Sequence, residues 1–193
     1  MNRFGLLSLC LVFVGLSCNP ERVQYTKELK QEMADMKIKR VTNADLVSTV
    51  DNLGAKISAV AQRELAAQLE KTTDPAEQAT LCKLQNLPKT QALARSYGLS
   101  IQLLGEADVQ NKALSQKERE VLDAYLYNAE KNLPQISNIQ KISDTLFIYN
   151  NPVPENSLIC KTCFGDQKEQ LAVWRLAFSK REVIRRMNTK NKK

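Results

Sequence analysis

The sequence predicts an α+β domain, in which a small antiparallel sheet is flanked by helices and preceded by a long N-terminal helix. The chain has 193 residues, which is enough for one ordinary domain. Hydrophobic residues make up 43% of it and charged residues 25%, a balance that is typical of proteins with a packed core. Helical periodicity dominates up to residue 98 and alternating patterns dominate afterwards. Helices followed by strands indicate the α+β class.

The first half of the domain predicts three helices. Apolar residues recur at alternating steps of four and three from Leu46 to Val60, which predicts a long helix that begins at Thr42 or Asn43. Asp74 before a proline is a typical helix start, so we expect a second helix that carries Cys82. A third helix is expected over residues 89–97, where the following glycine would end it.

The second half predicts strands separated by one well-marked helix. Ser115 and Glu118 form a capping box that opens this helix. Residues 136–142 and 145–150 indicate two adjacent antiparallel strands. The remaining expected elements are a strand over residues 100–104, a strand over residues 172–178, and a short helix from the end of that strand through Met187.

The N-terminus has the features of an export signal. A positive Arg3 precedes 13 mostly apolar residues at positions 4–16, fewer than the roughly 20 that span a bilayer. Small residues then precede Cys18, and this segment resembles the lipobox of bacterial lipoproteins, with Gly15 where leucine is usual. The resemblance implies that Cys18 is acylated and anchors the protein to a membrane. The alternative is a plain signal peptide that is cut near Ser17 and leaves a soluble secreted protein.

The expected organisation follows from this signal. Residues 1–17 form the lipoprotein signal peptide, 18–41 a tether or short helix, 42–188 the folded domain and 189–193 a basic tail. We expect the mature protein in the cell envelope, lipid-anchored and facing the periplasm or the cell surface. Export and an aromatic content of only 6% argue against a nucleic-acid partner. The basic residues near the C-terminus instead suit contact with anionic lipid headgroups, although a solvated helix end is the simpler interpretation.

The absence of histidine narrows the possible chemistry. It excludes Ser-His-Asp and Cys-His catalysis as well as every metal site that needs imidazole. The carboxylates are scattered at surface spacing and form no pair that suits acid–base catalysis. We therefore expect a protein that is not an enzyme.

Cys160-x-x-Cys163 is the most informative motif. The same spacing occurs in c-type haem attachment sites, in thioredoxin-like redox pairs and in local structural disulfides. A zinc site would need a second ligand pair, which makes it improbable when only Cys82 is left over in the domain. A thioredoxin-like function is the weakest of these interpretations, because no βαβ pattern surrounds the motif.

Several blocks, taken together in order, resemble the single-domain c-type haem family with a PAS-like sensor fold. These blocks are residues 81–85 (Leu-Cys-Lys-Leu-Gln), 97–101 (Tyr-Gly-Leu-Ser-Ile), the acidic helix from Ser115, 147–149 (Phe-Ile-Tyr) with Pro152, 160–165 (Cys-Lys-Thr-Cys-Phe-Gly) and 173–178 (Val-Trp-Arg-Leu-Ala-Phe). The resemblance covers roughly residues 41–188. It implies a PAS-like antiparallel sheet with haem held against it and linked to the Cys-x-x-Cys segment.

The sequence departs from this family at the residue that should bind iron. Phe164 stands where the family has its iron-ligating histidine, and phenylalanine offers iron no donor atom. We therefore expect a degenerate member that binds no haem, or binds it atypically, and in which Cys160 and Cys163 form a local disulfide. The alternative is a working haem c protein for electron transfer or sensing, with both cysteines attached to haem and Cys82 as axial ligand. Cys82 could also be a buried apolar residue, or pair with Cys160 or Cys163.

Trp174, Leu176 and Phe178 occupy alternate positions of a predicted strand and therefore share one face. The simplest interpretation is that this face belongs to the core. The functional interpretation is that Trp174 and Phe178, together with Phe164, form the apolar wall of a ligand pocket.

Overall fold

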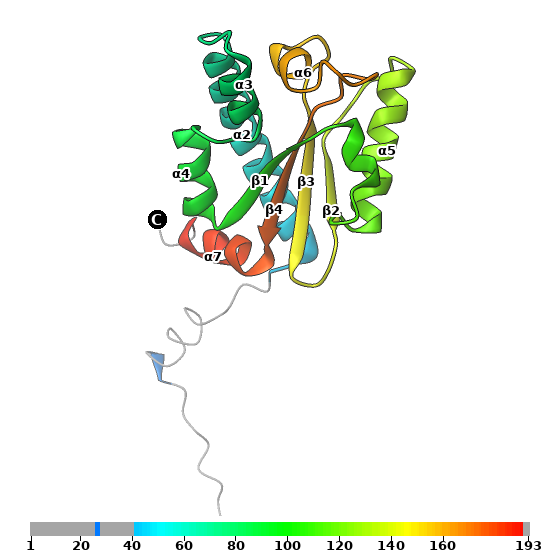
Figure 1. Cartoon of the computed structure of the whole chain (residues 1–193). Coiled ribbons are helices and arrows are strands. Elements are labelled where there is room, and N and C mark those ends of the chain that lie inside the picture. The colour runs from blue at the N-terminus through cyan, green and yellow to red at the C-terminus, as the bar shows by residue number, and fades with distance from the viewer. Residues whose placement is uncertain (1–25, 28–40, 191–193) are drawn as a thin grey trace, which may run out of the picture. The chain divides into compact units, whose positions relative to one another are not determined.

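The computed structural model describes residues 26–27 and 41–190 (Figure 1). A compact unit begins at Val41. The expected signal peptide, the lipid-attachment residue Cys18, most of the tether and the end of the basic tail lie outside the described residues. The predictions for those segments therefore stay predictions.

Three helices open the domain, and each begins or ends at the signal that predicted it. Thr42 and Asp45 form a capping box at the start of the long helix, and Asp74 caps the second helix by accepting a hydrogen bond from the Ala76 amide (3.1 Å). Gly98 ends the third helix in the left-handed conformation with φ of 58°, which glycine adopts without strain. The three helices are α2 (Asn43–Leu69), α3 (Pro75–Cys82) and α4 (Pro88–Tyr97).

The rest of the domain contains four strands, a 3₁₀ helix and three α-helices. The capping box of Ser115 and Glu118 opens the predicted middle helix. In order, the elements are β1 (Leu99–Leu104), η1 (Glu106–Gln110), α5 (Gln116–Glu130), β2 (Asn138–Lys141), β3 (Leu146–Pro152), α6 (Leu158–Cys163), β4 (Val173–Ser179) and α7 (Lys180–Lys190). The sequence analysis did not predict η1 and α6. Each has five or six residues, which is too few to show a helical period.

The strands form one antiparallel sheet in the order β1-β4-β3-β2. The chain pairs β2 with β3 as a hairpin, and β4 then enters between β3 and β1. In this register Trp174 lies opposite Leu103, and Leu176 lies opposite both Ile101 and Tyr149. The sheet, the helices around it and the long first helix confirm the predicted α+β class.

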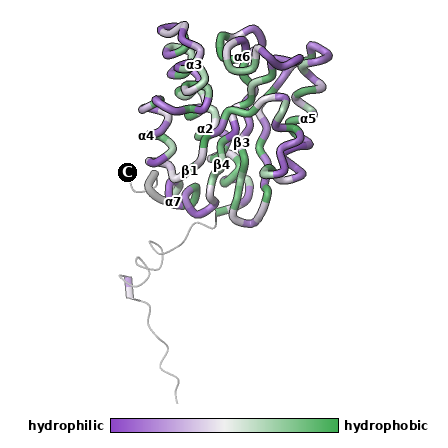
Figure 2. The backbone as a smooth tube through the Cα atoms, in the orientation of Figure 1, coloured by the Kyte–Doolittle hydropathy of each residue, from purple (hydrophilic) through white to green (hydrophobic). Residues whose placement is uncertain are grey.

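The larger core lies between α2 and the sheet. The apolar stripe of α2 faces β3 and β4 (Figure 1). In β4 the alternate residues Trp174, Leu176 and Phe178 are buried in this core, as predicted from their spacing. Figure 2 shows the hydrophobic residues concentrated along the central strands, with hydrophilic residues on the outer helices. The largest fully buried side chains of this core include Trp174, Tyr149, Phe147, Leu46, Leu65 and Leu87.

A smaller core and a buried ion pair cover the other face of the sheet. Leu122 and Tyr125 of α5 pack on Val173 of β4. Beside them the Arg175 guanidinium contacts the Glu118 carboxylate at 2.6 and 2.7 Å, and both side chains are largely buried. Burial of Glu118 acts to raise its pKa, but hydrogen bonds from Ser115 and Arg175 outweigh this and lower the pKa below its usual value. Glu118 of the capping box thus also holds α5 against the sheet.

We predict that Gly54→Ala destabilises the domain. A Cβ atom at this position would lie 2.4 to 2.6 Å from ring atoms of Tyr149, so either the ring or α2 must move. Overpacking of this kind costs about 1–3 kcal/mol. Alanine gains about 1 kcal/mol over glycine in helix propensity, and we expect the cost of overpacking to exceed this gain. Thermal unfolding should show a lower melting temperature for Gly54→Ala. The exposed Lys56→Ala on the same helix is the control and should leave the melting temperature nearly unchanged.

Candidate functional site

The candidate site centres on α6, the short helix that carries both cysteines of the Cys-x-x-Cys motif. Ser157 caps it by accepting a hydrogen bond from the Cys160 amide at 3.2 Å. The helix packs against α2 and α3. The two cysteines have different environments, since Cys163 is in a disulfide and Cys160 is a free thiol.

Cys163 forms a disulfide with Cys82, the last residue of α3. The Cα atoms lie 5.5 Å apart and the two residues are 81 positions apart in the sequence. The expected disulfide between Cys160 and Cys163 is therefore wrong, and the structure has one of the alternative pairings. Side chains three residues apart on a helix have Cβ atoms about 5–6 Å from each other, whereas a disulfide needs about 3.5–4.5 Å. The helical conformation of α6 thus disfavours the local bond.

Cys160 is a free thiol in the core. Only 1% of the residue is exposed, and its Sγ lies 3.6 Å from the Pro154 carbonyl oxygen, which accepts its hydrogen bond. Burial raises the pKa of this thiol above its usual value. A nucleophilic cysteine needs the opposite shift together with access to solvent, so Cys160 is suited to packing rather than to thiol chemistry.

Phe164 lies directly after α6 and closes the following loop onto the sheet. Its amide donates to the Cys160 carbonyl (3.0 Å), and its ring lies against the backbone of Gly105, where a Cβ atom would approach the ring to 2.4 Å. Two further hydrogen bonds tie the same segments together. The Gln167 side-chain oxygen accepts from the Glu106 amide (2.8 Å), and the Glu106 carboxylate accepts from the Glu169 amide (3.0 Å).

Trp174 and Phe178 belong to the core, as the simpler interpretation predicted. They are 0% and 3% exposed and pack in the cluster beneath α2. Neither they nor Phe164 line any of the three pockets described below, and the expectation of a pocket wall stays a prediction. Within the described residues, the indole Nε1 of Trp174 has no hydrogen-bond partner.

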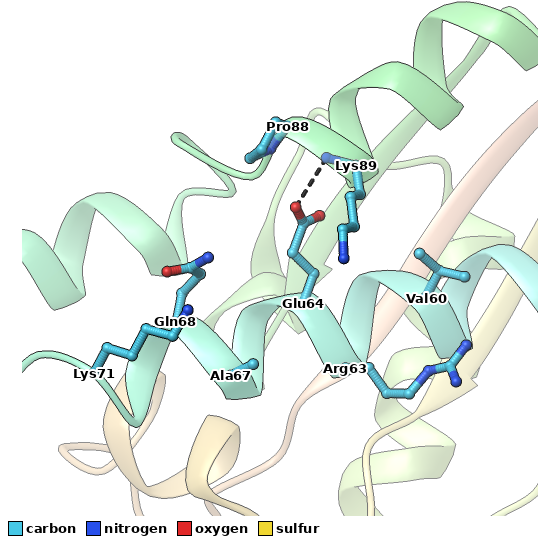
Figure 3. A pocket seen from close by; sticks show the side chains of 8 residues that line it. All are labelled: Val60, Arg63, Glu64, Ala67, Gln68, Lys71, Pro88 and Lys89. Atoms are coloured by element: carbon cyan, nitrogen blue, oxygen red, sulfur yellow. Dashed lines mark hydrogen bonds between the residues drawn. The ribbon is translucent and has the colours of Figure 1, made fainter.

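The largest of the three pockets, about 560 Å³, lies between α2 and the start of α4 (Figure 3). Its central acid is Glu64, which is 8% exposed. The Glu64 carboxylate accepts hydrogen bonds from the amides of Lys89 (2.8 Å) and Thr90 (2.6 Å) and from the Thr90 hydroxyl (2.7 Å). Leu87 at the N-cap of α4 supplies no side-chain bond, so Glu64 caps this helix from a distance. This use of the carboxylate is structural.

Sequence analysis missed the role of Glu64. A signal was present, because Leu87 and Pro88 start a helix without any capping side chain nearby. The partner, however, lies about 25 positions away on another helix and has no local pattern.

Two smaller pockets of about 470 and 240 Å³ adjoin each other beyond the C-terminal end of α5. They share Asn132, Gln135, Val153 and Glu155, and the rest of their lining mixes polar residues with prolines and other apolar residues. None of the three cysteines of the domain lines them. They offer hydrogen-bonding groups but no arrangement that suits a particular reaction.

The thiols do not suit covalent haem. Attachment through Cys160 and Cys163 needs two free thiols, and the Cys163 sulfur is bonded to Cys82. The same bond removes Cys82 as an axial ligand, so that expectation is wrong for this structure. Phe164 offers no donor, and the sequence has no histidine to replace it. Within the part of the chain that the structure describes, Cys160 is the one free thiol, and it is buried.

The described residues contain neither a cluster of metal ligands nor a helix that could span a membrane. Across 26–27 and 41–190, no three or more Cys, Asp or Glu side chains gather closely enough to hold a metal ion. Over the same residues, no helix combines the length and the apolar character that a membrane span needs. Comparisons of the chain with protein-family models, with curated proteins and with solved structures gave no match.

We predict that the Cys82–Cys163 disulfide is a major source of stability. A cross-link that closes a loop of this length lowers the entropy of the unfolded chain, which corresponds to about 4.5 kcal/mol at most. Reductant should lower the melting temperature of the wild type, and the double variant Cys82→Ser with Cys163→Ser should melt at the reduced value with or without reductant.

Cys160→Ala is the matched control for this prediction. It removes the free thiol and keeps the disulfide, so its melting temperature should still fall when reductant is added. Loss of that response in Cys160→Ala, or its persistence in the double variant, would contradict the pairing.

Proposed function

We propose that the chain is an exported, lipid-anchored protein whose domain is a non-enzymatic PAS-like module, similar to the c-type haem sensor family but with a degenerate haem site. The observation that carries this proposal is the disulfide between Cys82 and Cys163. It uses the second cysteine of the motif for a structural bond, at the position where the resemblance implies a haem.

The fold supports the PAS-like part of the proposal. An antiparallel sheet with helices on both faces and a long helix ahead of it is the arrangement that the resemblance implies. The motif segment lies on α6, between the central strands β3 and β4 in sequence and against α2 in space. The order of the matching blocks thus corresponds to one continuous packed domain.

The side chains around α6 support the loss of haem. Cys160 is packed in the core, Cys163 is cross-linked to α3, and the Phe164 ring covers the backbone at Gly105. These contacts fill the surroundings of the motif with protein. They also explain why a phenylalanine is stable at this position, since its ring has an apolar surface to cover.

The test of the degenerate site is a visible absorption spectrum of protein exported from cells that mature c-type haem, paired with a haem stain after denaturation. The wild type should show no Soret band and no stain. The double variant Phe164→His with Cys82→Ala supplies a ligand and frees the Cys163 thiol, so it should gain covalent haem.

The single variant Phe164→His is the matched control and should gain little haem, because Cys163 stays in its disulfide. A wild-type Soret band that survives denaturation would favour the working haem protein instead. A folded double variant that takes up no haem would contradict the relationship to the haem family.

The lipid anchor has a separate test. We predict that Cys18→Ala moves the protein out of the strongly held membrane fraction, because acyl chains contribute about 0.8 kcal/mol per buried methylene and no chain can be attached to alanine. Fractionation followed by a high-salt wash measures this. A Cys10→Ala control should stay anchored, and a Cys18→Ala protein that resists the wash as the wild type does would refute anchoring through this residue.

A further inference from the structure

The last helix of the domain presents a basic surface. Val183 of α7 is fully buried, and Ile184 and Met187 pack partly buried against the larger core, so the helix lies fixed along one end of the domain. Arg181 and Arg185 are exposed on its outer side. Arg185 contacts Glu182, the only acidic residue from position 180 to the C-terminus. The helix therefore carries a net positive charge.

Neighbouring elements add to this charge. Arg95, in the last turn of α4, is exposed beside α7, where the Arg186 guanidinium stacks on the Tyr97 ring at 4.4 Å and bonds to the Ser96 carbonyl. In the sequence, three more lysines follow at the end of the chain. We refer to Arg95, Lys180, Arg181, Arg185 and Arg186 as the basic end surface.

The chain enters the domain at this same end. Val41 packs on the larger core together with Ile184 and Met187, and α2 contacts α7. Figure 1 shows the first turns of α2 beside α7, with α3 and α6 at the opposite end of the domain. Only 22 residues separate Val41 from Cys18. The basic end surface therefore lies at the end of the domain where the chain from the proposed lipid anchor enters it.

The opposite end has a different charge balance. Acidic residues outnumber basic ones around the end of α2, α3, α6 and the end of α5. The acidic residues there are Glu70, Asp74, Glu77, Glu130, Glu155, Asp166 and Glu169, and the basic ones are Lys71, Lys83, Lys131, Lys161 and Lys168. Lys89 lies near Lys71 at this end, so acidic and basic residues are nearly balanced there. At the α7 end the acidic residues are Asp45 in the first turn of α2, Asp144 beside Lys180, and Glu182, and the basic residues outnumber them. An anionic bilayer would thus attract the α7 end more strongly than the opposite end.

We propose that the basic end surface binds the anionic phospholipid headgroups of the membrane that holds the anchor, so that the domain stands with α7 against the bilayer. This deepens the proposed function and rests on its lipid anchor. Arginine guanidinium groups suit the phosphates of headgroups, since they donate two parallel hydrogen bonds. At 0.1 M salt the electrostatic attraction between the arginines and the headgroups extends over about 10 Å. Side chains exposed on α7 come within this distance when the helix faces the membrane surface.

The test measures binding of the chain from residue 19, exported behind a separate cleavable signal, to vesicles. This protein keeps the whole described domain but has no acyl chain. It should sediment with vesicles containing phosphatidylglycerol, not with pure phosphatidylcholine, and high salt should release it. Arg181→Gln with Arg185→Gln should weaken binding about 25-fold, on the basis of a fivefold effect per residue near the surface.

The matched control is Lys83→Gln with Lys161→Gln, which removes the same charge from exposed positions at the opposite end. It should bind as the wild type does, and both variants should melt within a degree or two of it. No binding to anionic vesicles, equal binding to neutral vesicles, or equal weakening in the two variants would overturn the proposal. A failed anchor would instead appear in the Cys18→Ala fractionation, which does not depend on these arginines.

Discussion

The disulfide between Cys82 and Cys163 is the constraint on which the candidate site depends. It joins α3 to α6 across 81 positions of sequence and holds α6 against the helical layer. With Cys163 fixed in this way, Cys160 turns into the core and Phe164 covers the backbone at Gly105. These contacts use Cys160, Cys163 and Phe164 for packing and cross-linking, which is what the proposal of a degenerate haem site requires.

Two buried carboxylates are a second constraint on the fold around the site. Two carboxylates, Glu64 and Glu118, are buried, and each is held by several hydrogen bonds. Glu64 caps a helix that has no cap of its own, while Glu118 both opens α5 and pairs with Arg175 on the central strand. Removing the partners of either acid would leave an uncompensated buried charge and destabilise the folded state. Glu64 thereby ties α2 to α4, and Glu118 ties α5 to the sheet.

Much of this fold could be predicted because its signals are local. Thr42, Asp74 and Ser115 begin helices as their positions in the sequence indicate, and the alternation around Trp174 identified the buried face of β4. The features that were not predicted are non-local or short. Helix α6 has six residues and is too short to show a helical period. The spacing of three cysteines does not by itself select a pair. The selection depends on the helical conformation of α6, which keeps Cys160 and Cys163 too far apart for a disulfide. The remote cap by Glu64 is non-local as well.

Peptide mapping without reduction tests the central claim most directly. Lys161 lies between the two motif cysteines, so trypsin separates them into the peptides 142–161 and 162–168, while Cys82 lies in the peptide 72–83. After alkylation of free thiols, mass spectrometry of the protein should find peptide 72–83 linked to 162–168, with peptide 142–161 alkylated at Cys160. A link between 142–161 and 162–168, or haem attached to either of them, would contradict the account.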